Sequence, residues 1–328
     1  PMKILLTGPC GRHGFYTLLR LLDEGHEVRA FDTRDGFLSH PAGYHEELLR
    51  YVQNKGYELE WRWGDIRDAD AVRDAVADDI DAVIHHAAMT MPSHCGEEWE
   101  YCWDVNYYGT LNVISAVQQS SRSPKLIYSS SVANHGYPVD GKAAFTETDG
   151  LPSTCTYAAT KIASELAIQR SGINYTIMRM ATVGEPGFPE VMLIARYPHL
   201  RKRVDTENHL KGVASPCHLV STDDVNTAYL KALDNRASDR QVFLIAGPES
   251  CRTTFKAYTD RMHTSLGVEP TSDEDWGMGP YPQMYYDIAH SNALLNYAST
   301  EFEHIFEKTL AVAQMIPEFI ELSAPATT

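Results

Sequence analysis

The chain has 328 residues, 43% of them hydrophobic, and its 44 acidic and 28 basic side chains give a formal net charge of −16 at pH 7. This length supports one large α/β domain with a smaller lobe or two domains, and the acidic excess argues against nucleic acid or an anionic membrane as a partner. No apolar run approaches the ~20 residues of a membrane span, no basic-then-apolar leader is present, and the cysteines lack C-x-x-C spacing, so we expect reduced thiols in a cytoplasmic protein.

A strand, a glycine-rich loop and a helix open the chain. Residues 3–7 form a short apolar strand, and apolar residues at helical spacing run from Phe15 to Leu22 before Gly25. The glycines between them have the G-x-x-G-x-x-G spacing that lets backbone approach a pyrophosphate at a helix N-terminus. We therefore expect a dinucleotide-binding loop. Its candidate cofactor contacts are Gly8, Cys10, Gly11, Arg12, His13 and Gly14.

An acidic residue ends the second predicted strand. Residues 28–31 form this strand, and Asp32 follows at its end. A carboxylate there suits hydrogen bonding to the adenosine ribose hydroxyls and repels a 2′-phosphate. Asp32 therefore favours NAD over NADP. Together with the strand and the helix, it also favours a dinucleotide site over an ordinary strand-to-helix turn. Arg12 and Arg34 leave NADP as the less favoured cofactor.

Strands and helices continue to alternate through the first 180 residues. A helix through Val72 and Val76 and a long helix at 99–119 separate further strands, predicted at residues 58–63, 81–84, 125–128 and 175–179. Such alternation is typical of parallel strands joined by right-handed crossovers, which predicts an α/β fold with a doubly wound parallel (Rossmann) sheet. Ligands of such sheets bind at the carboxyl ends of the strands.

Tyr157 and Lys161 are four residues apart on a predicted helix. They therefore share one face, so that an ammonium can lie beneath a phenol and lower its pKa from about 10. A phenol tuned in this way can act as a general base near neutral pH. The spacing alone is common by chance, and its value here depends on the dinucleotide loop upstream.

Several short motifs follow one another in a specific order. They are Thr7-Gly8-x-x-Gly11-x-x-Gly14, Gly64-Asp65-Ile66, His86-Ala87-Ala88, residues 105–112, Tyr128-Ser129-Ser130-Ser131, Tyr157-x-x-x-Lys161 and residues 220–225. Together they resemble the extended short-chain dehydrogenase/reductases, the NAD-dependent epimerase/dehydratase family. The resemblance runs from residue 3 to about residue 235 and is weaker beyond it.

The resemblance implies roles for residues at the strand ends. Asp65 and Ile66 would flank the adenine of the cofactor, and Ala87 and Ala88 would line its cleft. Asn106 is a further candidate for cofactor binding, although asparagine is unfavourable within a helix. Two interpretations of Asn106 stay open, a structural hydrogen bond to the neighbouring strand and a supporting role in a proton relay.

The resemblance also implies the catalytic groups. Ser131, with Ser130 as the fallback, would hydrogen-bond the reacting hydroxyl. Tyr157 would take its proton, and Lys161 would hold the nicotinamide ribose and tune Tyr157. Oxidation of a secondary alcohol of a sugar or sugar nucleotide, with hydride transfer to NAD, follows from these roles.

The outcome of that reaction separates several hypotheses. Hydride return to the opposite face gives an epimerase, and release of the ketone gives a dehydrogenase. Dehydratases of this family carry Thr-Asp-Glu where Ser131-Val132-Ala133 stands here, which disfavours dehydration. The alternatives are an NADP-dependent carbonyl reductase of a non-sugar substrate and a non-catalytic protein that senses NAD(P).

The substrate-binding candidates are less specific than the catalytic ones. Thr90 follows the cleft alanines, Thr182 stands where epimerases carry an asparagine, and His135 replaces the usual tyrosine before Gly136. Arg196 belongs to a basic cluster that either grips a diphosphate or carboxylate or is a solvated helix end. The substrate-binding candidates are Thr90, Ser131, Thr182 and Arg196. We expect no metal site, because the spacing of the histidines and cysteine at 85–95 fits no tetrahedral centre.

We predict two structural parts. Residues 1–180, with 215–245 returning to them, would form the dinucleotide-binding domain, and residues 181–214 and 246–328 would form a smaller C-terminal α/β lobe that binds substrate. Helices are expected at 223–233, 253–266 and 301–322, with a strand at 241–245. By resemblance, the helices at 99–119 and 155–171 would pair with a second subunit in a homodimer.

Overall fold

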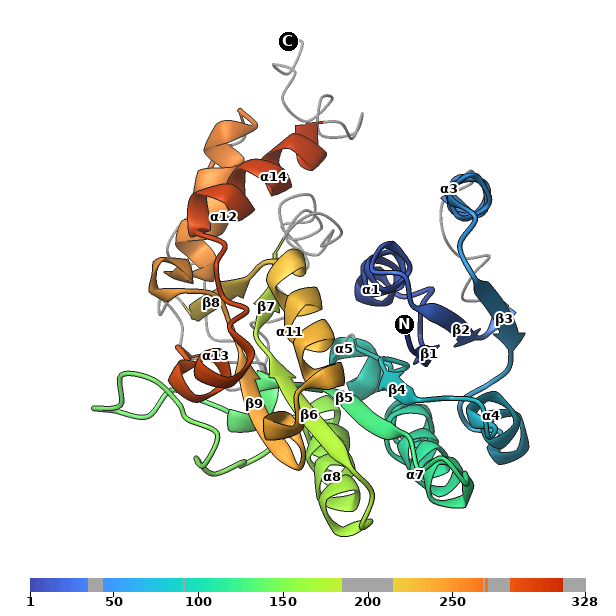
Figure 1. The fold of residues 1–328 in the computed structure, drawn as a ribbon. Coiled ribbons are helices and arrows are strands. Elements are labelled where there is room, and N and C mark those ends of the chain that lie inside the picture. The colour runs from blue at the N-terminus through green and yellow to red at the C-terminus, as the bar shows by residue number, and fades with distance from the viewer. Residues whose placement is uncertain (35–43, 91, 185–214, 268, 271–283, 315–328) are drawn as a thin grey trace.

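A computed structural model describes residues 1–34, 44–90, 92–184, 215–267, 269–270 and 284–314 (Figure 1). Within these ranges a seven-stranded sheet forms the centre of the molecule, in the order β3-β2-β1-β4-β5-β6-β9. All neighbouring strands in it are parallel, which confirms the predicted doubly wound fold. The strands are β1 (Lys3–Thr7), β2 (Glu27–Asp32), β3 (Leu59–Trp63), β4 (Ala82–His85), β5 (Lys125–Ser131), β6 (Tyr175–Met180) and β9 (Gln241–Ile245).

Helices cover both faces of this sheet (Figure 1). On one face lie α1 (Arg12–Asp23), α3 (Tyr44–Lys55), α11 (Thr222–Asp234) and α13 (Ala289–Leu295). On the other lie α4 (Ala69–Val76), α7 (Gly109–Gln119) and α8 (Thr156–Arg170). Because side chains alternate along a strand, Ile4 and Leu6 enter the first core and Leu5 enters the second. Apolar runs without alternating polar positions are therefore expected in the central strands.

The predicted helix at 99–119 is present but not uniform. It comprises α6 (Trp99–Trp103), a π-helical turn (Asp104–Tyr108) and α7, and the short helix α5 (Pro92–Glu97) precedes it. A π-helical turn inserts an extra residue into the helical repeat and is frequent at functional sites. Here it carries Asn106 at its centre.

A second sheet lies beside the carboxyl end of the first. It has the strand order β10-β8-β7, formed by β7 (Thr182–Val183), β8 (Pro216–Val220) and β10 (Arg252–Thr254). The helices α12 (Phe255–Ser265) and α14 (Phe302–Gln314) share an apolar core with β8. This sheet and its helices form a smaller α/β lobe.

The elements after residue 215 differ in part from the prediction. The strand at 241–245 is confirmed as β9, but residues 252–254 form β10 and the helix begins only at Phe255. The hydroxyl of Thr254 caps this helix by accepting from the Ala257 amide at 3.1 Å, which sets its start. The last predicted helix is described from Phe302 to Gln314, and its continuation lies outside the described residues. Because β8 joins the second sheet and β9 the first, the division at 215–245 stays a prediction.

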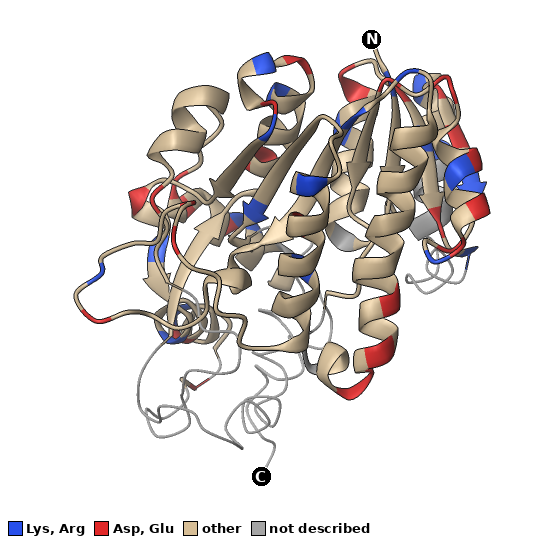
Figure 2. Cartoon of the chain, turned by 90° about the horizontal axis from the view of Figure 1, so that it is seen from below, with Lys and Arg blue, Asp and Glu red and all other residues tan. Residues whose placement is uncertain are grey.

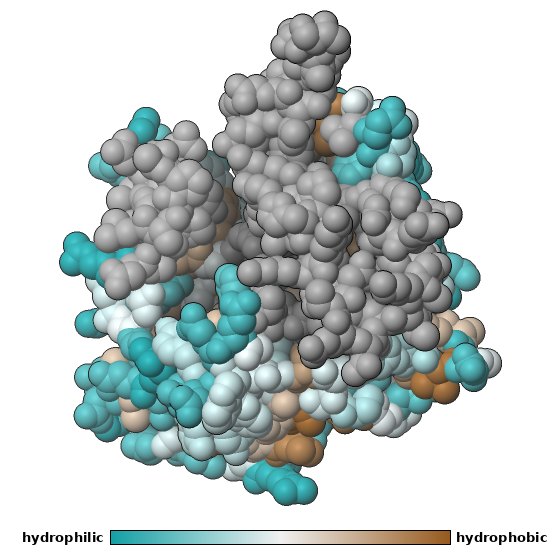
Figure 3. Space-filling model, turned by 180° about the vertical axis from the view of Figure 1, so that it is seen from behind, coloured by the Kyte–Doolittle hydropathy of each residue, from teal (hydrophilic) through white to brown (hydrophobic). Residues whose placement is uncertain are grey.

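The surface of the described part is charged but not polarised. Acidic and basic residues are scattered over helices and loops in Figure 2. On the face shown in Figure 3, hydrophilic residues predominate among those described, with small hydrophobic groups between them. None of the described helices has the length and apolar character needed to cross a bilayer. All six cysteines are free thiols.

Candidate active site

The loop after β1 is closed by two glycines that no other residue replaces easily. Gly8 has a φ of 73°, and a Cβ there would lie 2.7 Å from the Ala87 amide nitrogen. A Cβ on Gly14 would lie 2.0 Å from the Gly8 carbonyl oxygen. The first glycine therefore permits the left-handed turn, and the second lets α1 approach the turn. This is the backbone geometry predicted from the spacing of the glycines.

The N-terminus of α1 fits the pyrophosphate of a dinucleotide. Gly11 is the N-cap residue and provides no side-chain cap for the first amides of the helix. Such amides, together with the helix dipole, favour an anionic group. The residues present therefore fit the predicted cofactor, although the side chain of Arg12 lies outside the described residues.

Asp32 lies at the carboxyl end of β2 and joins the loop. Its carboxylate accepts hydrogen bonds from the amides of Cys10 and Thr33, each at 2.8 Å. Burial and the neighbouring Asp32 carboxylate raise the pKa of the Cys10 thiol. Cys10 is therefore a neutral thiol at physiological pH and adds no negative charge beside a pyrophosphate.

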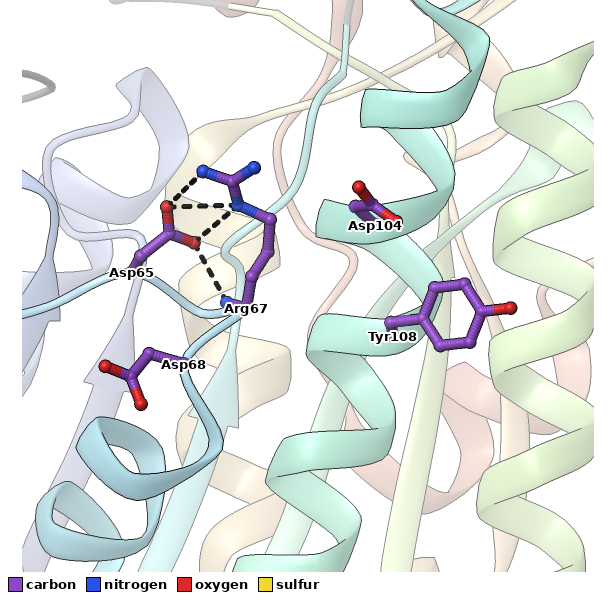
Figure 4. Close-up of a pocket in the computed structure, with 5 residues that line it drawn as sticks. All are labelled: Asp65, Arg67, Asp68, Asp104 and Tyr108. Atoms are coloured by element: carbon purple, nitrogen blue, oxygen red, sulfur yellow. Dashed lines mark hydrogen bonds and ion pairs between the residues drawn. The ribbon is translucent and has the colours of Figure 1, made fainter.

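Asp65 and Ile66 follow β3 at the same edge of the sheet. Figure 4 shows Asp65 paired with Arg67, beside Asp104 and Tyr108 of the π-helical turn. The Arg67 guanidinium donates to both carboxylate oxygens, at 2.6 to 3.1 Å, and lowers the pKa of Asp65. These residues and Asp68 line an open hollow of about 490 Å³. Ile66 is buried and faces Gly109.

The segment after β4 is held by Asn106. The side chain of Asn106 accepts from the Met89 amide at 2.7 Å and donates to the Met89 carbonyl at 3.0 Å. It also donates to the Thr160 hydroxyl of α8 at 3.0 Å. Asn106 therefore makes a structural hydrogen bond to the segment that follows the neighbouring strand, which agrees with one of its two interpretations. Ala87 and Ala88 precede Met89, and Thr90 follows it on the exposed surface.

Tyr157 and Lys161 lie on the first turns of α8, where this helix passes over the carboxyl end of β5. The Lys161 ammonium lies 5.9 Å from the centre of the Tyr157 ring and 4.9 Å from that of Tyr128. It donates to the Ser129 carbonyl at 2.8 Å, which attaches α8 to β5. The structure thus brings Lys161 beneath Tyr157 and beside β5, the strand that ends in Ser129, Ser130 and Ser131.

The two serine candidates differ in their surroundings. Ser130 is buried, and its hydroxyl donates to the Glu165 carboxylate. Ser131 lies partly exposed at the end of β5, where its hydroxyl accepts from the Ala133 amide at 3.2 Å. Because successive side chains of a strand point to opposite faces, only one of the pair can face the cleft, and Ser131 is the accessible one.

The charge of Lys161 depends on its buried position. Burial lowers its pKa to about 8, against opposing contributions from Cys102, Cys95 and Glu165. An amine with a lowered pKa is charged below that value and neutral above it. Lys161 is therefore an ammonium at neutral pH, as a partner for a phenolate requires.

Two histidines and a tyrosine form a cluster beside the glycine loop that the sequence did not predict. The rings of His13, His86 and Tyr229 lie 4.9 to 5.9 Å apart, and the Ser129 hydroxyl contacts His86 Nδ1 at 2.6 Å and the Tyr229 hydroxyl at 2.8 Å. Burial lowers the pKa of His13 to about 4, so its ring is neutral. Histidine in a glycine loop was the available signal, but its partners come from three other elements.

The remaining substrate candidates are less informative. Thr182 is buried on β7, where it pairs with Leu219 of β8. His135 is buried against Phe145, and burial lowers its pKa to about 3. Arg196 and its basic cluster lie outside the described residues. Within the described ranges, no group of three or more His, Cys, Asp or Glu side chains is arranged to hold a metal ion.

Comparison with known proteins extends this description. Residues 4–246 match the NAD dependent epimerase/dehydratase family model. A UDP-glucose 4-epimerase of Neisseria meningitidis serogroup C is 30% identical over 203 residues, which are 60% of this chain and 57% of that protein. A UDP-glucose 4-epimerase of Pisum sativum is 29% identical over 161 residues, 49% of this chain and 45% of that protein. The chain therefore spans about half the length of these curated relatives.

Two solved structures have the same fold. One is a UDP-glucose 4-epimerase of Thermotoga maritima with UDP-glucose, at a TM-score of 0.75 and 21% identity over 95% of this chain and 99% of that one. The other is a dTDP-glucose 4,6-dehydratase of Bacillus anthracis in complex with NAD, at a TM-score of 0.77 and 17% identity over 97% and 98%. At such identities the likeness establishes the fold and leaves the reaction to the residues of the site.

Proposed function

Since this chain belongs to the NAD-dependent epimerase/dehydratase family, we propose that it is an enzyme that oxidises a secondary alcohol of a sugar nucleotide with NAD. The observation that carries the proposal is the position of Lys161, a buried ammonium 5.9 Å from the Tyr157 ring and bonded to the strand that ends in Ser131. Acid-base chemistry on an alcohol needs these groups together.

The residues of the chain divide the reaction among them. Bound NAD would supply the hydride acceptor and a further positive charge. Tyr157, as the phenolate, takes the proton of the substrate hydroxyl, and Lys161 favours that phenolate through its charge. Ser131 hydrogen-bonds the same hydroxyl and orients it. Gly8, Gly11 and Gly14 bring backbone amides to the pyrophosphate, and Asp32 supports the adenosine ribose.

The proposed cofactor and outcome follow from two local features. The carboxylate of Asp32 would repel a 2′-phosphate, which favours NAD over NADP. After Ser131, Val132 and Ala133 offer no carboxyl group that could protonate a leaving hydroxyl. We therefore propose an epimerase or dehydrogenase and not a dehydratase.

The test is turnover with defined substrates. The protein is titrated with NAD and NADP by calorimetry, and the NAD complex is then incubated with UDP-sugars while proton NMR follows the sugar. We expect tighter binding of NAD than of NADP and either conversion to an epimer or accumulation of a ketone with reduced NAD. Tight NAD binding without turnover of any nucleotide sugar would favour the sensor hypothesis, and preference for NADP would favour the carbonyl reductase.

We also propose that the protein is a homodimer. Large hydrophobic side chains are exposed on α6, the π-helical turn and α8, among them Trp99 at 54%, Tyr108 at 55% and Leu166 at 46%. Exposed apolar groups gathered on adjacent helices favour association with a second copy. Light scattering is expected to give twice 36.7 kDa.

A charged side chain introduced on this face tests whether the face forms the dimer interface. Leu166→Glu is expected to shift the mass to that of the monomer, because a carboxylate would be buried at the interface. The matched control is Val139→Glu, since Val139 is similarly exposed, at 54%, and belongs to a loop outside these helices. A dimer that survives Leu166→Glu, or one that Val139→Glu dissociates equally, contradicts the assigned face.

A further inference from the structure

A buried ion pair lies directly beneath the serine strand end. The side chains of Arg179 on β6 and Glu165 on α8 are 5% and 2% exposed. The guanidinium donates to both carboxylate oxygens, Nε at 3.0 and 3.1 Å and a terminal nitrogen at 2.7 Å. Taking two charges out of water is costly, and a buried pair of this kind is a weak source of stability. Its retention in the core therefore points to another role.

The pair is the centre of a network that includes the turn after Ser131. The Glu165 carboxylate accepts from the Ser130 hydroxyl and, at 2.9 Å, from the Asn134 side-chain amide. Asn134 lies in the 3₁₀ turn Val132–His135 that directly follows Ser131. The segment that carries Ser131 is thus anchored on both sides to one carboxylate.

The guanidinium contacts the same turn and one further segment. Arg179 donates to the Glu147 carbonyl at 3.0 Å and contacts His135 Nε2 at 3.4 Å. The Glu147 carboxylate in turn accepts from the Leu244 amide of β9 at 3.2 Å. The ion pair therefore joins α8, β5, β6 and the segment around Glu147, which in turn bonds to β9.

Glu165 continues the catalytic face of α8. Tyr157, Lys161 and Glu165 are spaced four residues apart, so they lie along one side of the helix. Lys161 binds the Ser129 carbonyl and Glu165 binds the Ser130 hydroxyl, at successive positions of β5. The helix is thereby attached to the strand at two adjacent points. Both points lie immediately before Ser131.

We propose that Glu165, held by Arg179, is a positioning residue that sets the active-site serine segment against the helix that carries Tyr157 and Lys161. The inference rests on the proposed function, because the distance it controls matters only if these groups share a substrate hydroxyl. A carboxylate suits the position, since it accepts hydrogen bonds at both oxygens and donates none. A glutamine would direct an amide donor against the donors of Ser130, Asn134 or Arg179.

The test compares Glu165→Gln with the loss of a partly buried ion pair at the start of β5. Glu165→Gln is expected to lower kcat about 100-fold through misplacement of the serine segment, with the Kd for NAD within threefold of wild type. Amide hydrogen exchange in residues 129–136 is expected to accelerate at least tenfold, because the segment loses its anchor. Asn134→Ala, which removes one hydrogen bond and no charge, is expected to change both measurements in the same direction by a smaller factor.

Lys125→Met is the matched control. Lys125 begins β5, is 9% exposed in its side chain and pairs with Asp239 at 2.6 Å, at the opposite edge of the sheet. Its loss is expected to lower the thermal midpoint and to leave kcat and the exchange of residues 129–136 unchanged. Equal losses of kcat in Lys125→Met and Glu165→Gln would overturn the proposal, because general destabilisation would then explain both.

The remaining outcomes separate the two proposals. A folded Glu165→Gln protein with wild-type kcat and exchange overturns the positioning role. If Glu165→Gln does not fold, Asn134→Ala decides, and unchanged kcat and exchange in that variant overturn the role. If the wild type turns over no nucleotide sugar, the proposed function fails by itself, and hydrogen exchange still decides whether Glu165 orders residues 129–136.

Discussion

Tyr157→Phe is expected to lower kcat about 1000-fold, since general acid-base groups contribute roughly 10² to 10⁴. Phenylalanine keeps the ring and its contact with Lys161 but has no hydroxyl to take the proton of the substrate. The Kd for NAD is expected to change by less than about threefold, because the glycine loop and Asp32 are untouched. Steady-state kinetics with a nucleotide sugar and calorimetry with NAD measure the two quantities.

Tyr175→Phe is the matched control for that variant. Tyr175 begins β6 at the opposite edge of the sheet and is buried. Removal of its hydroxyl is expected to leave kcat within about twofold, because the group is far from the strand ends where ligands bind. A Tyr157→Phe protein that keeps more than a tenth of wild-type kcat would reject Tyr157 as the base.

The free energy of unfolding is expected to fall by several kcal/mol between pH 7.5 and pH 5, at roughly 2 kcal/mol for each buried histidine. Burial lowers the pKa of His85 and His135 to about 3 and that of His13 and His218 to about 4, from 6.5. At pH 5 each of these rings costs roughly 2 kcal/mol, because the unfolded chain binds a proton that the folded protein excludes. Such a loss is comparable with the total stability of many proteins, about 5 to 15 kcal/mol.

The direction of this effect follows from proton binding. Below pH 6.5 the unfolded state carries more protons than the folded state, so the stabilisation is complete above pH 6.5 and is lost as the pH falls. Carboxylates affect the free energy of unfolding in a lower pH range. Ion pairs and hydrogen bonds lower the pKa of Asp79 and Asp149 to about 2, so their contribution disappears only below about pH 3.8. Between pH 7.5 and 5 the histidines dominate.

Denaturant unfolding at the two pH values measures the difference. His218→Gln is expected to shrink it by about 2 kcal/mol, since that ring no longer titrates. The control is His304→Gln, because His304 is exposed on α14, and it should leave the difference unchanged. A free energy of unfolding at pH 5 within 1 kcal/mol of the value at pH 7.5 would contradict the neutral, buried state of these histidines.

Most strands of the large sheet could be predicted because they are largely buried, with continuous apolar runs. The predicted strands at 3–7 and 241–245 agree with β1 and β9 to the residue. The glycine loop could be predicted equally well, because the spacing of the glycines and the backbone angles that need glycine are local properties. The elements that escaped prediction are α3, with 12 residues, and the shorter α5, α13, β7 and β10. The four shorter elements have too few residues to show a hydrophobic period, and contacts with other parts of the chain order them.

The residues of the candidate site likewise divide into those that local spacing predicts and those that only the folded contacts reveal. Tyr157 and Lys161 were found because one helical turn separates them, and helical geometry alone places them on one face. Glu165 lies one turn further along the same face of α8, but the Tyr-x-x-x-Lys pattern does not include it. Its partner Arg179 stands within an apolar strand, where a charge is informative, but nothing local indicates which acid meets it.

The amino-acid order by itself determined the class of fold, the nucleotide loop and the pairing of Tyr157 with Lys161, because each depends on interactions within a few residues. Only the tertiary structure decided that Ser130 is committed to Glu165 while Ser131 stays accessible, and that His13, His86 and Tyr229 meet. Those contacts join separate strands and helices, and their energies depend on burial, which arises only when the sheet and its two helical layers close around them.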